Sequence, residues 1–149
     1  MGAVRIKIAA SVYQRMMMDM PYPPPESGGI LGSRDGVVCK IYLDQSQQSQ
    51  TSLIYQPDIE QLNHQIQAWQ QDGIRFAGMF HTHIAEEETL SGDDLAYIKR
   101  IVHVLPKGYG QLFFPIVIPN TKIIMYSATA HKRDVFVGQE DIEIIRDEV

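Results

Sequence analysis

Two histidines separated by one residue, His81 and His83, stand out among the side chains of this chain that can do chemistry. They follow residues 74–80, an apolar stretch that predicts a β-strand. Because residues i and i+2 of a strand face the same side, both imidazoles should point to one place. After seven intervening residues, Ser91 begins a predicted helix that carries Asp94 in its first turn. Two histidines and one carboxylate can hold zinc and leave its fourth position open for catalysis.

The segment Ser91-Gly92-Asp93-Asp94 also has an interpretation without a metal. A serine followed three residues later by an acidic residue is typical of a helix N-cap. The helix dipole favours acidic residues in the first turn in any case. Capping alone would explain both aspartates, but it would not explain the pair of histidines on the preceding strand. Adjacent helix residues point about 100° apart, so only one of the two aspartates should be a ligand.

These residues together resemble the motif of the JAMM metalloproteases of the JAB/MPN superfamily. That motif is a glutamate, a variable gap, His-Ser/Thr-His, seven residues, Ser, two residues and Asp. The chain supplies Glu26, His81-Thr82-His83, Ser91 and Asp94, with the seven-residue gap intact. The stretch around the glutamate, Pro-Pro-Glu-Ser-Gly-Gly-Ile-Leu-Gly, is similar to the family's Pro-x-Glu-x-x-Gly-x-Leu-x-Gly. The resemblance covers residues 4–128.

The resemblance implies a zinc-dependent metallopeptidase or isopeptidase that holds one Zn²⁺ per chain through His81, His83 and Asp94. Glu26 would be the general base that takes a proton from the attacking water, and Ser91 would hydrogen-bond the developing oxyanion. The spacing selects Asp94 rather than Asp93 as the third ligand.

Small stand-alone members of the family look like prokaryotic enzymes that act on the C-terminus of a ubiquitin-like or sulfur-carrier protein. The connection after Asp94 is short and no second Cys/His cluster follows, which argues against a dedicated polyubiquitin enzyme. Ile84 and Leu90 stand where relatives often have proline, so the loop between them should differ in shape and substrate preference. Its three glutamates either are simply solvated, or screen substrates by charge, or include one that swings onto the zinc.

Two other functions fit parts of the sequence. The first is a non-catalytic MPN scaffold that binds partner proteins, although such relatives typically lack some motif residues. The second is another zinc hydrolase, such as a deaminase-like enzyme, although the usual Cys-x-x-Cys ligands are absent.

Composition limits the class of protein further. The chain has 149 residues, with 44% hydrophobic and 21% charged, which suits one globular domain spanning 1–149. The net charge of -5 and the absence of Lys/Arg runs argue against nucleic acid as a partner. We expect no membrane partner, because no apolar run approaches the ~18 residues of a span. The single cysteine, Cys39, permits no intramolecular disulfide. Without a secretory signal, a cytoplasmic location is expected.

The elements that must position the motif residues follow from periodicity and turn signals. We expect strands at 4–8, 28–33, 37–43, 53–55, 74–80, 112–118, 123–128 and 135–137, and helices at 12–20, 58–71 and 91–104. Asp35-Gly36 predicts a hairpin, and the tail at 140–149 could be helix or strand. This order favours an α/β fold, a single domain with a mixed central β-sheet flanked by helices. The resemblance implies the same class, similar to MPN and cytidine-deaminase-like folds.

Overall fold

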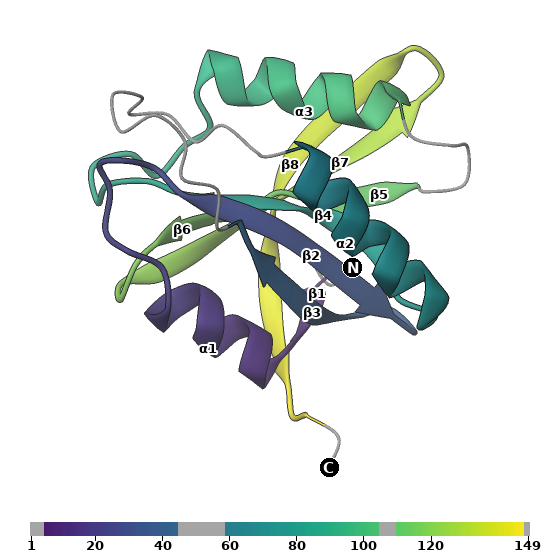
Figure 1. Ribbon diagram of the computed structural model, residues 1–149. Coiled ribbons are helices and arrows are strands. Elements are labelled where there is room, and N and C mark those ends of the chain that lie inside the picture. Colours follow the sequence, from purple (N-terminus) through teal and green to yellow (C-terminus); the bar gives the residue numbers. More distant parts are fainter. Residues whose placement is uncertain (1–4, 45–58, 105–109, 148–149) are drawn as a thin grey trace.

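Eight strands and three helices make up the part of the chain that the computed structural model describes, residues 5–44, 59–104 and 110–147 (Figure 1). In chain order they are β1 (Arg5–Ala9), α1 (Ala10–Met18), β2 (Gly28–Arg34), β3 (Val37–Leu43), α2 (Ile59–Gln71), β4 (Arg75–Thr82), α3 (Gly92–Val104), β5 (Gln111–Phe113), β6 (Ile116–Ile118), β7 (Lys122–His131) and β8 (Asp134–Ile145). The strand predicted at 53–55 lies outside the described residues.

The strands form one mixed sheet that closes on itself. Their order is β2-β3-β1-β8-β7-β5-β4-β6, and β2 also pairs with β4, so seven of them complete a ring. The short strand β6 adds to this ring by pairing with both β4 and β7. The result is a closed mixed β-barrel with three short helices packed on it (Figure 1).

The predicted fold class, a helix-flanked central sheet of the MPN or cytidine-deaminase-like type, is therefore wrong. The strand β2 pairs with β3 along one edge and with β4 along the other. This second pairing joins β2 and β4, the first and last of the seven strands in the ring. The strand β8 has twelve residues and pairs with both β7 and β1. The sequence predicted only a short strand at 135–137, followed by a tail that could be helix or strand. Hydrophobic patterning locates strands in the chain but does not choose their partners, and here partner choice decides between open and closed.

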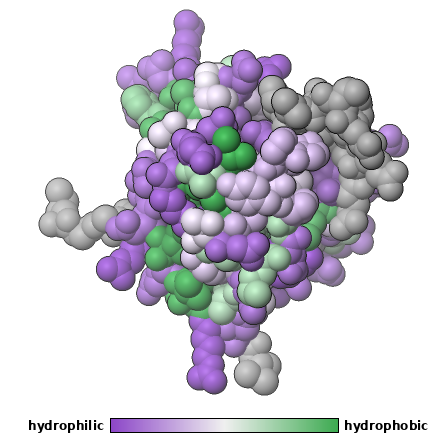
Figure 2. All heavy atoms as spheres, turned by 90° about the vertical axis from the view of Figure 1, so that its left-hand side faces the viewer, coloured by the Kyte–Doolittle hydropathy of each residue, from purple (hydrophilic) through white to green (hydrophobic). Residues whose placement is uncertain are grey.

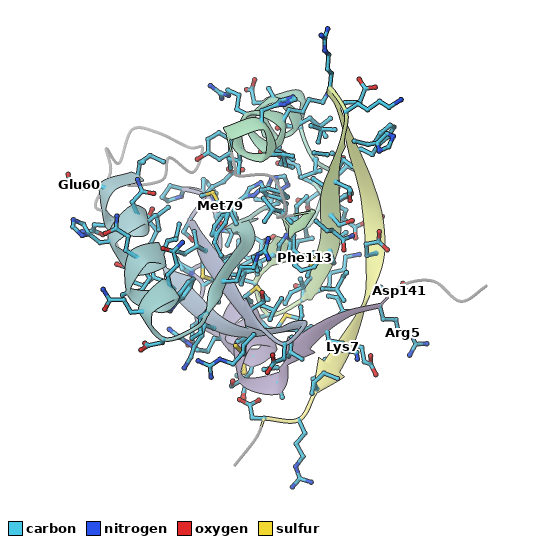
Figure 3. The ribbon with its side chains drawn as sticks, turned by 90° about the vertical axis from the view of Figure 1, so that its right-hand side faces the viewer. Arg5, Lys7, Glu60, Met79, Phe113 and Asp141 are labelled. Carbon is cyan, nitrogen blue, oxygen red and sulfur yellow. The ribbon has the colours of Figure 1, made fainter. Side chains whose placement is uncertain are left out.

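Alternation along the strands explains how the barrel is filled. In β1, Ile6 and Ile8 are buried while Arg5 and Lys7 point outward (Figure 3). In β4, which is buried on both faces, Phe76 belongs to the apolar cluster that includes α2 and α3, and Phe80 belongs to the cluster that includes α1. A strand covered on both sides appears in sequence as one apolar run, as residues 74–80 do.

One turn and one close contact between strands depend on backbone conformations that favour glycine. Asp35 and Gly36 have φ values of 52° and 80°, and they join β2 to β3 as the predicted hairpin. Gly78 has φ of 149°, and a Cβ there would lie 1.7 Å from the carbonyl oxygen of Phe113 in neighbouring β5. Glycine is therefore required where β4 meets β5.

Helix α1 begins differently from the prediction. The helix expected at 12–20 starts at Ala10, and its N-cap residue, Ala9, makes no side-chain capping bond. The carboxylate of Asp147 accepts hydrogen bonds from the backbone N–H of Ser11, at 2.8 Å, and from its hydroxyl. A residue just past β8 therefore caps a helix near the start of the chain.

Figure 2 shows one face of the molecule coloured by hydropathy. On the face in Figure 2, hydrophilic side chains surround small separate groups of apolar ones. None of the described helices combines the length and the apolar character needed to cross a membrane.

Candidate metal centre

The antiparallel register of β2 and β4 brings Glu26 to the two histidines. Gly28 pairs with His81, so the residues before Gly28 run alongside those after His81. Ser27 and Thr82 continue the pairing, with Ser27 N–H donating to the threonine hydroxyl at 2.9 Å and Thr82 N–H donating to the Ser27 carbonyl at 2.8 Å. One residue further, Glu26 reaches His83, with Oε2 3.7 Å from Nε2.

The imidazoles of His81 and His83 converge as the strand periodicity predicts. Their Nε2 atoms lie 2.8 Å apart, and the side chains are 15% and 3% exposed. The other ring nitrogen of His83, Nδ1, lies 2.9 Å from the carbonyl oxygen of Glu87. A carbonyl only accepts, so Nδ1 carries a proton and the neutral ring keeps a lone pair on Nε2. His83 is therefore held in the tautomer that a metal ion requires at Nε2.

Asp94 approaches both histidines from the first turn of α3. Its Oδ1 lies 3.3 Å from Nε2 of His81, and its Oδ2 lies 3.4 Å from Nε2 of His83. The same carboxylate accepts the backbone N–H of Ser91 at 2.9 Å, while the Ser91 hydroxyl accepts the N–H of Asp94 at 3.0 Å. This reciprocal pair is a capping box, so the helix-cap interpretation of the Ser91–Asp94 segment describes real contacts, while the same carboxylate also faces both imidazoles.

The charges around the histidines shift two pKa values. Burial by itself would lower the pKa of His83, but the hydrogen bonds to Asp94 and to the Glu87 carbonyl and the charge of Glu26 outweigh it and raise this pKa. Burial would raise the pKa of Asp94, but hydrogen bonds from His81 and His83 hold that pKa far below its usual range. Asp94 is therefore an anion at any physiological pH, which a metal ligand must be.

The donor set fits zinc. Ligand atoms about 2.0–2.2 Å from a tetrahedral zinc lie about 3.4 Å from one another. The separations found here run from 2.8 Å between the imidazoles, through 3.3 and 3.4 Å to Asp94, to 3.7 Å between His83 and Glu26. Two nitrogens and carboxylate oxygens are also the ligand types of catalytic zinc sites. Donor atoms of Glu26, His81 and His83 all lie within 4.8 Å of one another, so either carboxylate is close enough to complete the set.

The acidic loop after His83 is anchored at several points. The backbone N–H of Ala85 donates to the hydroxyl of Tyr22 at 2.9 Å, and the hydroxyl of Tyr126 donates to the carbonyl of Glu88 at 3.2 Å. Lys122 forms an ion pair with the Glu88 carboxylate. Because the Glu87 carbonyl lies between these anchors, they hold the group that orients His83.

The structure separates the other candidate residues. Ser91 is exposed and caps α3, and its hydroxyl still has a proton to donate. Asp93 is exposed and lines the cavity beside the histidines rather than facing both rings as Asp94 does.

Sequence reasoning missed part of the site. Tyr97 and Arg100, which line the same cavity, follow Asp93 at helical spacing, and that spacing could have revealed them. No local signal marks Tyr22 or Tyr126 as loop anchors, since their partners are distant in the chain.

The comparisons with known proteins concern the fold. No protein-family model matches the chain, and no curated protein matches it. A protein from Desulfitobacterium hafniense, solved in solution, superimposes with a TM-score of 0.65 at 20% identity, over 95% of this chain and 93% of that one. A protein from Salinibacter ruber, also solved in solution, gives a TM-score of 0.53 at 18% identity, over 95% and 92%. At 20% and 18% sequence identity the structural similarity shows a shared fold and gives no information about activity.

Proposed function

We propose that this protein is a zinc-dependent metallopeptidase that hydrolyses a peptide or isopeptide bond. One observation carries the proposal: the Nε2 atoms of His81 and His83 converge with the carboxylates of Asp94 and Glu26. The sequence motif that ends in Ser91 and Asp94 also supports the proposal, and because of it we propose that the protein is related to the JAMM metalloproteases. That proposal rests on the motif residues and not on the fold class, since the helix-flanked sheet is not found.

The residues divide the chemistry between them. His81, His83 and Asp94 would hold the ion, which when bound would acidify water and polarise the scissile carbonyl. Glu26 accepts the proton of the attacking water and passes it to the leaving amine as the C–N bond breaks. The hydroxyl of Ser91 donates to the oxygen on which negative charge develops.

The proposed substrate is a protein with a cleavable C-terminal segment, such as a ubiquitin-like or sulfur-carrier protein. The resemblance suggests this class, and the acidic chain gives no reason to add nucleic acid as a partner. We keep the cytoplasm as the proposed location, where the single thiol of Cys39 would stay reduced.

One observation favours a second candidate, a non-catalytic protein-binding module. The capping box explains the position of Asp94 without any metal. Zinc binding separates the two functions, because a module that uses Asp94 only as a helix cap has no reason to take up the ion.

The test combines metal analysis with peptidase assays on matched variants. Wild type supplied with zinc should retain about one equivalent per chain, as one three-ligand site implies. Asp94→Ala should lose both zinc and turnover, whereas Asp93→Ala, its neighbour on the same helix turn, should keep both. Glu26→Gln should keep zinc and lose turnover, since it removes the base and preserves size.

Three results would contradict the proposal. Wild type that retains no zinc would favour the binding module. Equal small effects from the two aspartate variants would leave Asp94 as a cap. Zinc loss in Glu26→Gln with zinc retained in Asp94→Ala would make Glu26 the ligand instead of the base.

A further inference from the structure

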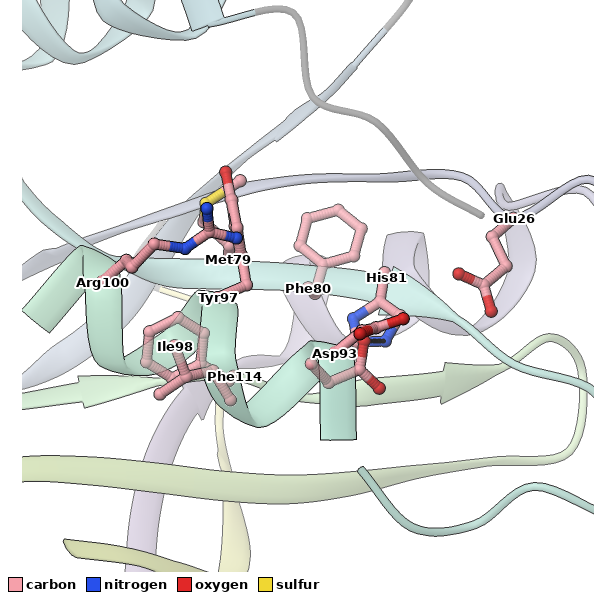
Figure 4. Close-up of a pocket in the computed structure, with 10 residues that line it drawn as sticks. Glu26, Met79, Phe80, His81, Asp93, Tyr97, Ile98, Arg100 and Phe114 are labelled. Atoms are coloured by element: carbon pink, nitrogen blue, oxygen red, sulfur yellow. Dashed lines mark ion pairs between the residues drawn. The ribbon is translucent and has the colours of Figure 1, made fainter. Parts of the chain in front are cut away.

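A cavity of about 190 Å³ opens beside the candidate metal centre. At one end it is bounded by Glu26 and His81 (Figure 4). Asp94, which lies against His81, also lines the cavity, and the walls are mainly apolar. The wall residues include Met79, Phe80, Ile98 and Phe114. An engineered apolar cavity of about 150 Å³ holds benzene, so this one has room for a single ring-sized or leucine-sized side chain. It is smaller than the ~300 Å³ and more of typical sites for whole drug-sized ligands.

Arg100 supplies a positive charge away from the metal-binding end. Figure 4 shows Arg100 and Glu26 on opposite sides of the cavity, with Phe80 and His81 between them. The guanidinium of Arg100 lies 5.6 Å from the ring centroid of Tyr97, a cation–π contact that holds the Arg100 side chain beside the cavity. Within the described residues Arg100 forms no ion pair with a carboxylate, and it is exposed.

The spacing along α3 sets how far a bound group extends from the scissile bond. Asp94 and Arg100 are six residues apart, a rise of about 9 Å. Helical side chains lean toward the N-terminus, and the guanidinium does so here, over Tyr97. An extended peptide advances about 3.3 Å per residue, so a charge one or two residues past the cleaved bond comes within reach.

We propose that this cavity binds the leaving segment of the substrate, a C-terminal extension of one or two residues with an apolar side chain and a free carboxylate paired with Arg100. The guanidinium fork matches a carboxylate in geometry and charge. It also matches phosphate, but hydrolysis of a peptide bond near a C-terminus releases a segment that ends in a carboxylate and not in a phosphate. This inference rests on the proposed peptidase function and names the part of the substrate that the enzyme removes.

The test is calorimetric titration of the protein with the dipeptide Phe-Gly, its C-terminal amide and Gly-Gly. Wild type should bind Phe-Gly about tenfold more tightly than the amide, since a charge-assisted hydrogen bond contributes about that factor. Gly-Gly should bind more weakly than Phe-Gly, because it leaves the apolar walls unfilled. Arg100→Gln should bind the acid and the amide equally, while the control Lys99→Gln removes the same charge from the adjacent helix position and should keep the preference. Both sites are exposed and glutamine is a good helix former, so both variants should fold.

The same titration on metal-free protein keeps this proposal separate from the peptidase proposal. Equal binding of acid and amide by wild type, or an undiminished preference in Arg100→Gln, would overturn the carboxylate site while leaving zinc uptake and turnover as they are. An acid preference in a protein that takes up no zinc and cleaves no peptide would overturn the peptidase and leave the carboxylate site standing.

Discussion

Replacing Gly78 by alanine tests the closure of the barrel, on which the position of the histidines depends. An added Cβ would lie 1.7 Å from the carbonyl oxygen of Phe113, whereas ordinary contacts begin at 3.4 Å. The strands β4 and β5 must therefore separate by about 1.7 Å, which breaks hydrogen bonds whose normal N···O distance is about 2.9 Å.

The cost of Gly78→Ala can be worked out from two contributions. Two lost backbone hydrogen bonds cost about 1 kcal/mol each. A non-glycine residue held in a sparsely populated backbone region costs about 1–3 kcal/mol. The sum is about 3–5 kcal/mol, set against a total stability of about 5–15 kcal/mol for a domain. For this size a loss of 1 kcal/mol lowers the Tm by about 2–4 °C, so we expect a decrease of about 6–20 °C.

Urea denaturation and thermal melting would measure the effect, with Gly138→Ala as the matched control. Gly138 lies in β8 opposite Ser127, and a Cβ there would meet nothing within 4 Å. Alanine at that position should be neutral or stabilise the protein by about 0.5–1 kcal/mol, because glycine loses more chain entropy on folding. If Gly78→Ala unfolded within 1 kcal/mol of wild type, as the control should, β4 and β5 could not be in contact as described, and closure of the ring through β5 would be refuted.

Ser91→Ala should lower kcat by about 10²–10³ through loss of an oxyanion donor while zinc affinity is kept, and an unchanged kcat would leave Ser91 a helix cap only. Tyr126→Phe removes the hydrogen bond to Glu88 and should weaken zinc binding by about fivefold, since one such bond contributes about 1 kcal/mol; titration with a zinc indicator would measure it, and an unchanged affinity would contradict the anchoring role. Hydrogen bonds from Ser11 lower the pKa of Asp147, so its stabilising contribution exists above the usual carboxyl pKa and is lost as the pH falls through the lowered value. Asp147→Asn should therefore lower the Tm at neutral pH and match wild type in strong acid, and a Tm difference that persists there would argue against the ionised cap.

Much of the secondary structure was predictable because its signals are local. The Asp35-Gly36 turn and the flanking strands follow from positive φ preferences and alternation. The helices at 58–71 and 91–104 were placed within a residue of Ile59–Gln71 and Gly92–Val104 by apolar spacing. The strand expected at 112–118 is two strands, β5 and β6, because Pro115 between them has no N–H to donate to a continuous ladder.

The barrel itself was not predictable because closure is decided by distant pairings. The pairing of Gly28 with His81 and that of Ile8 with Ile144 both join residues far apart in the chain. The hydrophobic pattern shows that each segment is a strand, but it does not show which strand edges pair with one another. The same limit hid Asp147 as the cap of α1, since a capping residue is sought next to the helix and not at the far end of the chain.

The candidate site was more predictable than the fold because most of it is local. His81 and His83 share a face through strand geometry, and Asp94 follows them within one loop and one helix turn. Only Glu26 comes from elsewhere, and the β2–β4 register, not the number of intervening residues, brings it in.

The helix cap and the proposed metal ligand at Asp94 are complementary rather than competing roles. The N–H of Ser91 holds the Asp94 carboxylate at Oδ2, and the same carboxylate faces Nε2 of both histidines. A ligand fixed by a backbone donor loses less side-chain entropy when an ion binds, because its rotamer is already selected. Glu26 does not lie on a helix. It precedes β2, the strand that pairs with β4, and its Oε2 lies 3.7 Å from Nε2 of His83. The Asp94 carboxylate is held by a backbone N–H at the helix start, which suits coordination. The Glu26 carboxylate, which lines the cavity beside His81, suits proton transfer to a bound substrate.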